Sequence, residues 1–160
     1  MKLSIRKGFS FGLTSGIITT LGLMVGLNAG THSKLAVLGG ILIIAIADAF
    51  SDAMAIHISE EAEAKHTEKE IWESTLSTLF SKFIFAITFV VPVLLLSLSE
   101  AIMVSIVWGL SLIVVFSFHM ARQQKAKPLN VVAEHLFIAI LVIVITNYMG
   151  EEIGLRFGPI

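Results

Sequence analysis

The sequence predicts an all-α integral membrane protein with five transmembrane helices and a short acidic cytoplasmic helical extension after the second helix. Composition is the first reason, because 56% of the 160 residues are hydrophobic and only 14% are charged. The mean hydropathy of +0.90 implies more apolar surface than a soluble domain of this size can bury. The second reason is a series of five apolar stretches, each long enough to cross about 30 Å of hydrocarbon at 1.5 Å per residue.

The predicted spans are separated by short polar turns and belong to a single transmembrane domain, residues 1–160. They cover residues 8–28, 35–59, 76–98, 101–120 and 129–149. Basic residues precede the first span, as in a signal peptide, but the span is long and no small-residue cleavage site stands out at its end, so a retained helix is expected. Pro92 is predicted to kink the third span, and Pro128 stands where the first turn of the fifth tolerates proline.

Lysine and arginine predict the orientation. With five spans, one side of the membrane holds nine of these residues: Lys2, Arg6, Lys7, Lys65, Lys69, Lys82, Arg122, Lys125 and Lys127. The other side holds only Lys34 and Arg156. Because basic residues concentrate in cytoplasmic loops, the N-terminus is predicted in the cytoplasm and the C-terminus outside.

Several functions are disfavoured by the sequence. There is no cysteine, so neither a disulfide framework nor a thiolate metal site is expected. No basic aromatic patch suggests nucleic-acid binding. No nucleophile–base pair, phosphate loop or nucleotide fingerprint is present, so neither an enzyme nor a resident cofactor is expected. Asp48 and Asp52 lie one turn apart on one predicted helix, which disfavours an intramembrane aspartyl protease.

A line of acidic and imidazole side chains begins inside the second span and continues beyond it. This acidic stripe consists of Asp48, Asp52, Ser59, Glu63, His66, Glu70 and Glu73. At about 100° per residue the seven side chains fall within roughly 80° of arc, so an unbroken helix would carry them on one face for about 37 Å. The linker 59–74 has six glutamates and neither glycine nor proline, which favours such a helix.

The two aspartates of the stripe point to cation transport. A carboxylate within hydrocarbon costs about 2.5–3.5 kcal/mol on insertion scales, so a chain that keeps two is expected to use them. The alternative is a structural role, such as bonding to serine or threonine on a neighbouring helix. Glu60, Glu61 and Glu68 lie off the stripe and are expected on a solvated helix face.

Carboxylate and imidazole ligands suit Fe(II), Mn(II) and Zn(II). Glu63, His66 and Glu70 follow at i, i+3 and i+7, the helical spacing of Glu-x-x-His metal sites in bundles. The predicted metal-binding residues are Asp48, Asp52, Glu60, Glu63, His66, Glu70 and Glu73. Met54 is interpreted as a packing residue, and His57 is left open as packing or ligand.

The first span is rich in small residues, which allow helices in lipid to approach closely. Gly8, Gly12 and Gly16 recur every four residues, beside a row formed by Ser15, Thr19, Gly22 and Gly26. Tight helix packing is the favoured interpretation, and Ser15 and Thr19 are also predicted to line a polar pore. On other spans, Lys82 and Glu134 are interpreted as an intramembrane ion pair or as part of a proton relay.

The motifs of four spans resemble the vacuolar iron transporter family, which includes iron and manganese transporters and nodulin-like members. Residues 12–20 are similar to its first-helix segment Gly-x-x-Asp-Gly-x-Val-Thr-Thr, and residues 47–55 to its second-helix segment Ala-Asp-Gly-Phe-Ser-Met-Ala-Ala-Gly. Residues 78–83, with Pro92, resemble its third-helix Ser-Phe-x-Ser-Phe and proline, and residues 146–150 loosely match the end of its fifth helix. The likeness is most specific at residues 47–51.

The resemblance implies a homodimer that exports Fe²⁺ or Mn²⁺ from the cytoplasm in exchange for protons. It also implies a pathway at the dimer seam, lined by the first two helices, and metal capture by a cytoplasmic glutamate-rich extension. Two positions depart from the family. Its first-helix aspartate falls on Ser15 and its second-helix methionine on Asp52, either a swap that conserves charge in one pore, a change of ion, or a loss of transport.

The predicted function is therefore export of a divalent transition metal, Fe²⁺ or Mn²⁺, by proton antiport. The expected partners are the metal ion, protons and the lipid bilayer, with a second copy of the chain and no nucleic acid. The small size favours a prokaryotic plasma membrane. The alternative is a non-transporting membrane metal sensor or interaction protein with an acidic cytoplasmic helix.

Overall fold

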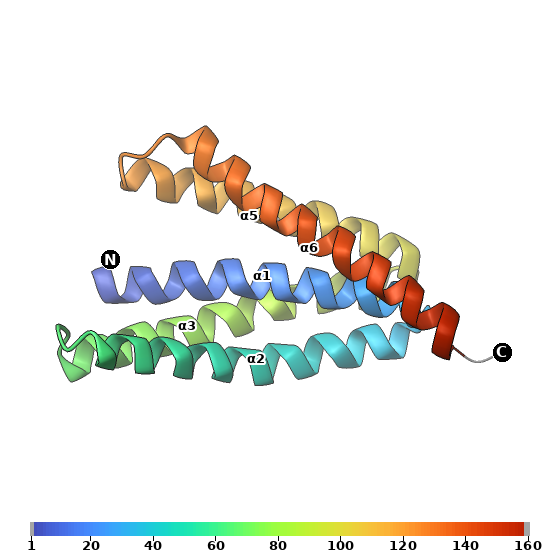
Figure 1. The fold of residues 1–160 in the computed structure, drawn as a ribbon, viewed down its shortest axis with the longest axis horizontal. Coiled ribbons are helices and arrows are strands. Elements are labelled where there is room, and N and C mark those ends of the chain that lie inside the picture. Colours follow the sequence, from blue (N-terminus) through green and yellow to red (C-terminus); the bar gives the residue numbers. More distant parts are fainter. Residues whose placement is uncertain (1, 159–160) are drawn as a thin grey trace. The chain divides into compact units, whose positions relative to one another are not determined.

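A computed structural model describes residues 2–158, and all regular secondary structure within them is helical. The helices are α1 (Leu3–Thr31), α2 (Lys34–Ala62), α3 (Glu68–Thr88), α4 (Val90–Leu95), α5 (Leu98–Gln123) and α6 (Pro128–Phe157) (Figure 1). With α3 and α4 taken together, five of these segments are long and apolar enough to cross a membrane. The predicted all-α class with five membrane-length helices is confirmed.

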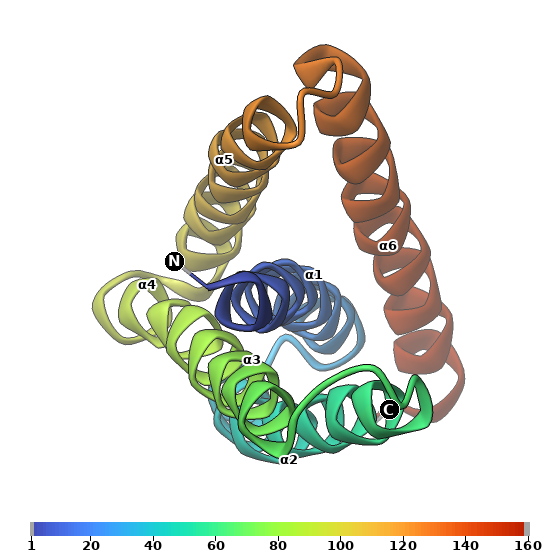
Figure 2. The same ribbon diagram turned by 90° about the vertical axis from the view of Figure 1, so that its left-hand side faces the viewer.

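The described residues fall into two compact units. Unit 1 comprises residues 2–20 and 41–90, so it contains the first part of α1, the second part of α2, and α3. Unit 2 comprises residues 21–40 and 91–158 and contains the remaining parts of α1 and α2 with α5 and α6. Within unit 2, α5 and α6 are antiparallel neighbours joined by residues 124–127 (Figure 2).

The third predicted span is interrupted close to its proline. The backbone N–H of Phe89 turns back to the carbonyl of Ala86 at 3.2 Å, and Phe89 separates α3 from α4. Pro92 has no N–H to give to the carbonyl four residues earlier, Thr88, and its ring crowds that carbonyl. The predicted distortion at Pro92 is thus present as a break at Phe89. Pro128 occupies the first turn of α6, as predicted.

The predicted helical extension after the second span is wrong. Helix α2 ends at Ala62, and Ala64 adopts the left-handed conformation with φ of 49°. A new helix then begins behind Thr67, whose side chain and backbone form a capping box with Glu70. The pattern Thr-x-x-Glu marks a helix start, and this local signal outweighs the helix propensity of the surrounding Ala, Glu and Lys residues.

Glycines of α1 bring α3 close in unit 1, which confirms the packing interpretation of this row. A β-carbon at Gly12 would collide with the Ser81 hydroxyl and the Thr78 carbonyl, and one at Gly16 would stand 3.0 Å from the Lys82 carbonyl. In unit 2 the same helix uses Gly26 against Thr146 of α6, where a β-carbon would lie 3.2 Å from the carbonyl oxygen. Small residues therefore place α3 and α6 in backbone contact with α1.

Substituting Gly12 by alanine is expected to destabilise the protein by about 1–3 kcal/mol, because the added methyl group overpacks a helix contact. Gly39 offers a matched control within α2, since a β-carbon there meets no atom within 4 Å. Gly39→Ala is expected to be neutral or to stabilise by up to about 1 kcal/mol through helix propensity. Thermal unfolding in detergent measures both variants, and equal transition temperatures would contradict the packing argument.

Candidate functional site

Asp48 and Asp52 of α2 share the ammonium group of Lys82 from α3 in unit 1. Lys82 Nζ lies 2.6 Å from Asp48 Oδ2 and forms an ion pair and a hydrogen bond with Asp52 Oδ2. The lysine side chain is only 2% exposed, whereas the side chains of Asp48 and Asp52 are 25% and 19% exposed. Two carboxylates and one ammonium therefore form a single charged cluster between two apolar helices.

Ser15 of α1 completes this cluster. Its hydroxyl donates to Asp52 Oδ2 at 2.7 Å and accepts from Lys82 Nζ at 2.9 Å. Ser15 and Asp52 thus lie in direct contact. Thr19, one turn further along α1, donates its hydroxyl to the Ser15 carbonyl at 2.9 Å, so its predicted pore-lining role stays a prediction.

The sequence positions the cluster through two local features. Asp48 and Asp52 are four residues apart on α2, so their side chains meet on one face. Gly16 lets the stem of Lys82 lie against α1, because a β-carbon at Gly16 would stand 3.2 Å from Lys82 Cγ. The long lysine side chain can then reach past α1 to the aspartates of α2.

The cluster carries a net charge of −1 when both aspartates and the lysine are ionised, two negative charges against one positive. A neutralising ion pair would need only one carboxylate. The second carboxylate leaves an uncompensated negative charge on an apolar helix, where charge is costly. Chemically, the cluster can exchange its ammonium for another cation or accept a proton.

A second ionic cluster lies where α2 ends, at the same end of unit 1 as the beginning of α1 (Figure 1). Glu60 Oε1 lies 2.5 Å from Lys7 Nζ, and Glu60 Oε2 lies 3.1 Å from His66 Nε2. Glu63 joins at 3.4 Å from His66 and 3.7 Å from Lys7. Two predicted metal-binding residues, Glu60 and Glu63, thus contact Lys7, and a third, His66, contacts both glutamates.

Burial separates Glu60 from the other glutamates off the stripe. The Glu60 side chain is 3% exposed and pairs with Lys7, and it also contacts His66, so the prediction of a solvated face is wrong for this residue. Glu61 and Glu68 are exposed as expected. The helical pattern of residues 59–74 predicted all three on a solvated face, because it carries no information about contacts with α1, which supplies Lys7.

The remaining stripe residues have separate roles in this structure. Glu73 on α3 binds Lys2 at 2.5 Å and accepts from the Ser4 hydroxyl at 2.7 Å. Glu70 accepts from the backbone N–H and the hydroxyl of Thr67, both at 2.9 Å, as the partner of the N-cap residue Thr67 in the capping box of α3. Ser59 is exposed on α2. The continuous seven-residue stripe on one helix is therefore wrong, since the break after Ala62 divides it.

The predicted metal-binding set does not converge on one point. Among residues 2–158, no group of three His, Asp or Glu side chains has a geometry that could hold a metal ion. Asp48 and Asp52 form one pair, and Glu60, Glu63 and His66 form a loose group at a second position. Their role in metal binding stays a prediction for both positions.

The pKa of the Glu63 carboxyl lies below its usual range, mainly because His66 donates a hydrogen bond to it and also because Lys7 is positively charged. A lowered carboxyl pKa means that this contact stabilises the fold above the unfolded pKa and is lost as pH falls through the folded pKa. The contribution of Glu63 therefore disappears on acidification.

Replacing His66 by alanine is expected to raise the pKa of Glu63 toward its ordinary value, because the largest cause of the shift is removed. Carbon-13 NMR of the glutamate carboxyl groups across a pH titration measures this. His32→Ala, in the turn between α1 and α2, serves as the control and should leave the Glu63 titration unchanged. An unaltered Glu63 midpoint in His66→Ala would contradict the assigned contact.

Sequence reasoning did not assign the lysine of either cluster, Lys82 or Lys7, to its carboxylates. Lys82 was linked to Glu134, but its partners are on α2, and Glu134 belongs to unit 2. The signal available was that Lys82 is the one basic residue of the predicted third span. His57, left open, bonds to the Thr75 hydroxyl at 2.9 Å and packs edge-on against Trp72, which favours packing.

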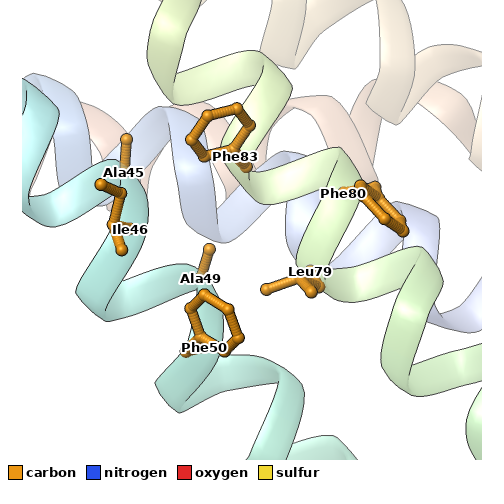
Figure 3. Close-up of a pocket in the computed structure, with 7 residues that line it drawn as sticks. All are labelled: Ala45, Ile46, Ala49, Phe50, Leu79, Phe80 and Phe83. Carbon is orange, nitrogen blue, oxygen red and sulfur yellow. The ribbon is translucent and has the colours of Figure 1, made fainter.

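A pocket of about 200 Å³ lies between α2 and α3 and contains no polar side chain (Figure 3). Its lining residues are Ala45, Ile46, Ala49, Phe50, Leu79, Phe80 and Phe83. Such a surface suits a hydrocarbon chain and offers no ligand to an ion. The charged cluster, and not this pocket, is therefore the candidate functional site.

The chain matches no model of a protein family, no curated protein and no solved structure.

Proposed function

We propose that this protein is a membrane transporter that moves a divalent transition-metal cation, Fe²⁺ or Mn²⁺, out of the cytoplasm in exchange for protons. The observation that carries the proposal is the sharing of one buried ammonium by two carboxylates on membrane-length helices. The excess negative charge attracts a cation, and carboxylate oxygen ligands from Asp48 and Asp52 suit Mn²⁺ and Fe²⁺. Protonation of the carboxylates on an acidic far side then releases the metal.

The second ionic cluster supports cytoplasmic capture of the metal. Glu60, Glu63 and His66 lie at the end of unit 1 that also holds Lys2 and Lys7. Lys82 is buried and does not count as a loop charge. Without it, eight of the nine basic residues remain on the side of the N-terminus, against Lys34 and Arg156 on the other side. That excess still supports a cytoplasmic location for the N-terminus and for the turn between α2 and α3.

A homodimer would cover the cluster. Asp48 and Asp52 are partly exposed, which is unfavourable against lipid. Beside them α2 exposes the small residues Ala47, Ser51 and Ala55, and small residues allow a second helix to approach closely. A second copy placed along this face would shield the aspartates from lipid and enclose a polar pathway.

Flux measurements test the proposal. The purified protein in liposomes with an acidic interior is expected to take up Mn²⁺ and Fe²⁺ from the more alkaline medium, because protons leave the liposomes in exchange. Changes in an enclosed pH dye should accompany the metal flux, and empty liposomes are the control. A panel of divalent ions identifies the transported metal. Absence of flux for every ion, at normal folding, would refute transport.

The same experiment tests the second candidate function, a non-transporting sensor or interaction protein. One observation favours it: Glu60, Glu70 and Glu73 already have protein partners, as in a structural network. Metal binding without flux, in a folded and dimeric protein, would support this function over transport.

A further inference from the structure

We propose that the Lys82 ammonium is a tethered cation that occupies the transport site in the absence of metal, leaves it when a divalent cation binds, and returns to release that cation. This role rests on the proposed transport function and assigns to Lys82 the control of metal affinity at the same site.

The position of the ammonium is the first argument. Lys82 Nζ lies between the Oδ2 atoms of Asp48 and Asp52, in ion-pair contact with both. These are the oxygens that a metal bridging the two aspartates would use. A divalent cation and an ammonium repel each other strongly at such short distances in an apolar surrounding. Binding of the metal between the aspartates therefore requires the ammonium to leave.

The charge of the cluster is the second argument. A lysine that served only to neutralise a buried acid would be balanced by one carboxylate, yet Lys82 faces two. The ammonium compensates half of the negative charge, and the other half remains available to attract a stronger cation. The cluster thus binds its ammonium but keeps one uncompensated negative charge.

The surroundings of Lys82 allow its ammonium to move away from the two aspartates. Ser15 accepts a hydrogen bond from Nζ at 2.9 Å, so the ammonium keeps an acceptor on α1 after it leaves the aspartates. Gly16 has no side chain to confine the lysine stem, which lies against α1 at that residue. A flexible four-carbon stem carrying a compact charge suits such a displacement better than a rigid arginine.

Removal and chemical replacement of the ammonium test the proposal. Lys82→Ala deletes the three terminal methylene groups and the amine, which n-propylammonium matches in size and charge. The variant is prepared in n-propylammonium, then freed of it, and its Mn²⁺ affinity is measured by calorimetry. The variant is expected to bind Mn²⁺ about tenfold or more tightly than the wild type, because its ion competitor is gone. Lys127→Ala, at the exposed start of α6, should bind as the wild type does.

Added n-propylammonium is expected to weaken Mn²⁺ binding to Lys82→Ala competitively and to leave the wild type unaffected. The neutral n-propanol should do neither. The proposal is overturned if the folded variant binds Mn²⁺ no more tightly than the wild type, or if the amine does not compete. Failure to fold even in n-propylammonium would mark Lys82 as purely structural and would also overturn it. A wild type that neither binds nor transports any divalent ion would instead refute the proposed function itself.

Discussion

Asp52→Asn is expected to abolish Mn²⁺ and Fe²⁺ flux, reducing it to the level of empty liposomes. Asparagine has nearly the shape of aspartate but carries no charge, so Asp48 and Lys82 would remain as a neutral pair. A neutral cluster no longer attracts a divalent cation, and the amide is a weaker ligand for it than a carboxylate. The variant also loses a group that could exchange the metal for a proton.

Folding of Asp52→Asn should be retained, because Lys82 keeps its contact with Asp48 at 2.6 Å. Glu68→Gln is the matched control, since Glu68 is an exposed carboxylate in the first turn of α3 and should leave flux unchanged. The measurement is metal uptake into proteoliposomes at equal protein content. Wild-type flux in Asp52→Asn would remove this residue from the transport pathway.

Lys82→Met is expected to destabilise the protein by about 3–5 kcal/mol, the cost of removing one partner from a buried ionic network. Methionine fills a volume similar to that of lysine, so the loss of stability results from the removed charge and not from a cavity. The side chain of Lys82 is 2% exposed, and the two aspartates would face each other without a counter-ion. Denaturant or SDS titration of the purified protein measures the change.

A second substitution shows whether this cost is electrostatic. Adding Asp52→Asn to Lys82→Met removes one of the two opposed negative charges, so the double variant should recover part of the lost stability. Strictly additive losses would mean that Lys82 and Asp52 are not coupled, and would contradict the contact between them. Bound Mn²⁺ should also stabilise Lys82→Met more than the wild type, because the metal supplies the missing positive charge.

The helices could largely be predicted because their signals are local. Length and hydropathy located all five membrane-length segments, and Pro92 and Pro128 marked a break and a start at nearly the right residues. The main error concerned residues 63–67, where helix propensity favoured continuation. A capping signal at Thr67 and Glu70 was present in the sequence and was the stronger local determinant.

The candidate site could be predicted only in part. Asp48 and Asp52 stood out as costly charges in an apolar stretch, and their four-residue spacing placed them together. Their partners could not be identified in the same way, because Ser15 and Lys82 are 37 and 30 residues from Asp52 in the chain. Helical periodicity describes one helix and contains no information about which face of another helix it meets.

The sequence by itself determined that the chain forms five apolar helices of membrane length and that one helix carries two aspartates. Hydrophobic content, proline and spacing act within a few residues, so they can be read along the chain. Only the tertiary structure decided that these aspartates share the ammonium of Lys82 and that Glu60 is buried against Lys7 and His66. The contact of Lys82 with the aspartates depends on how glycines let α3 approach α1, and such a property of two helix surfaces cannot be read along one of them.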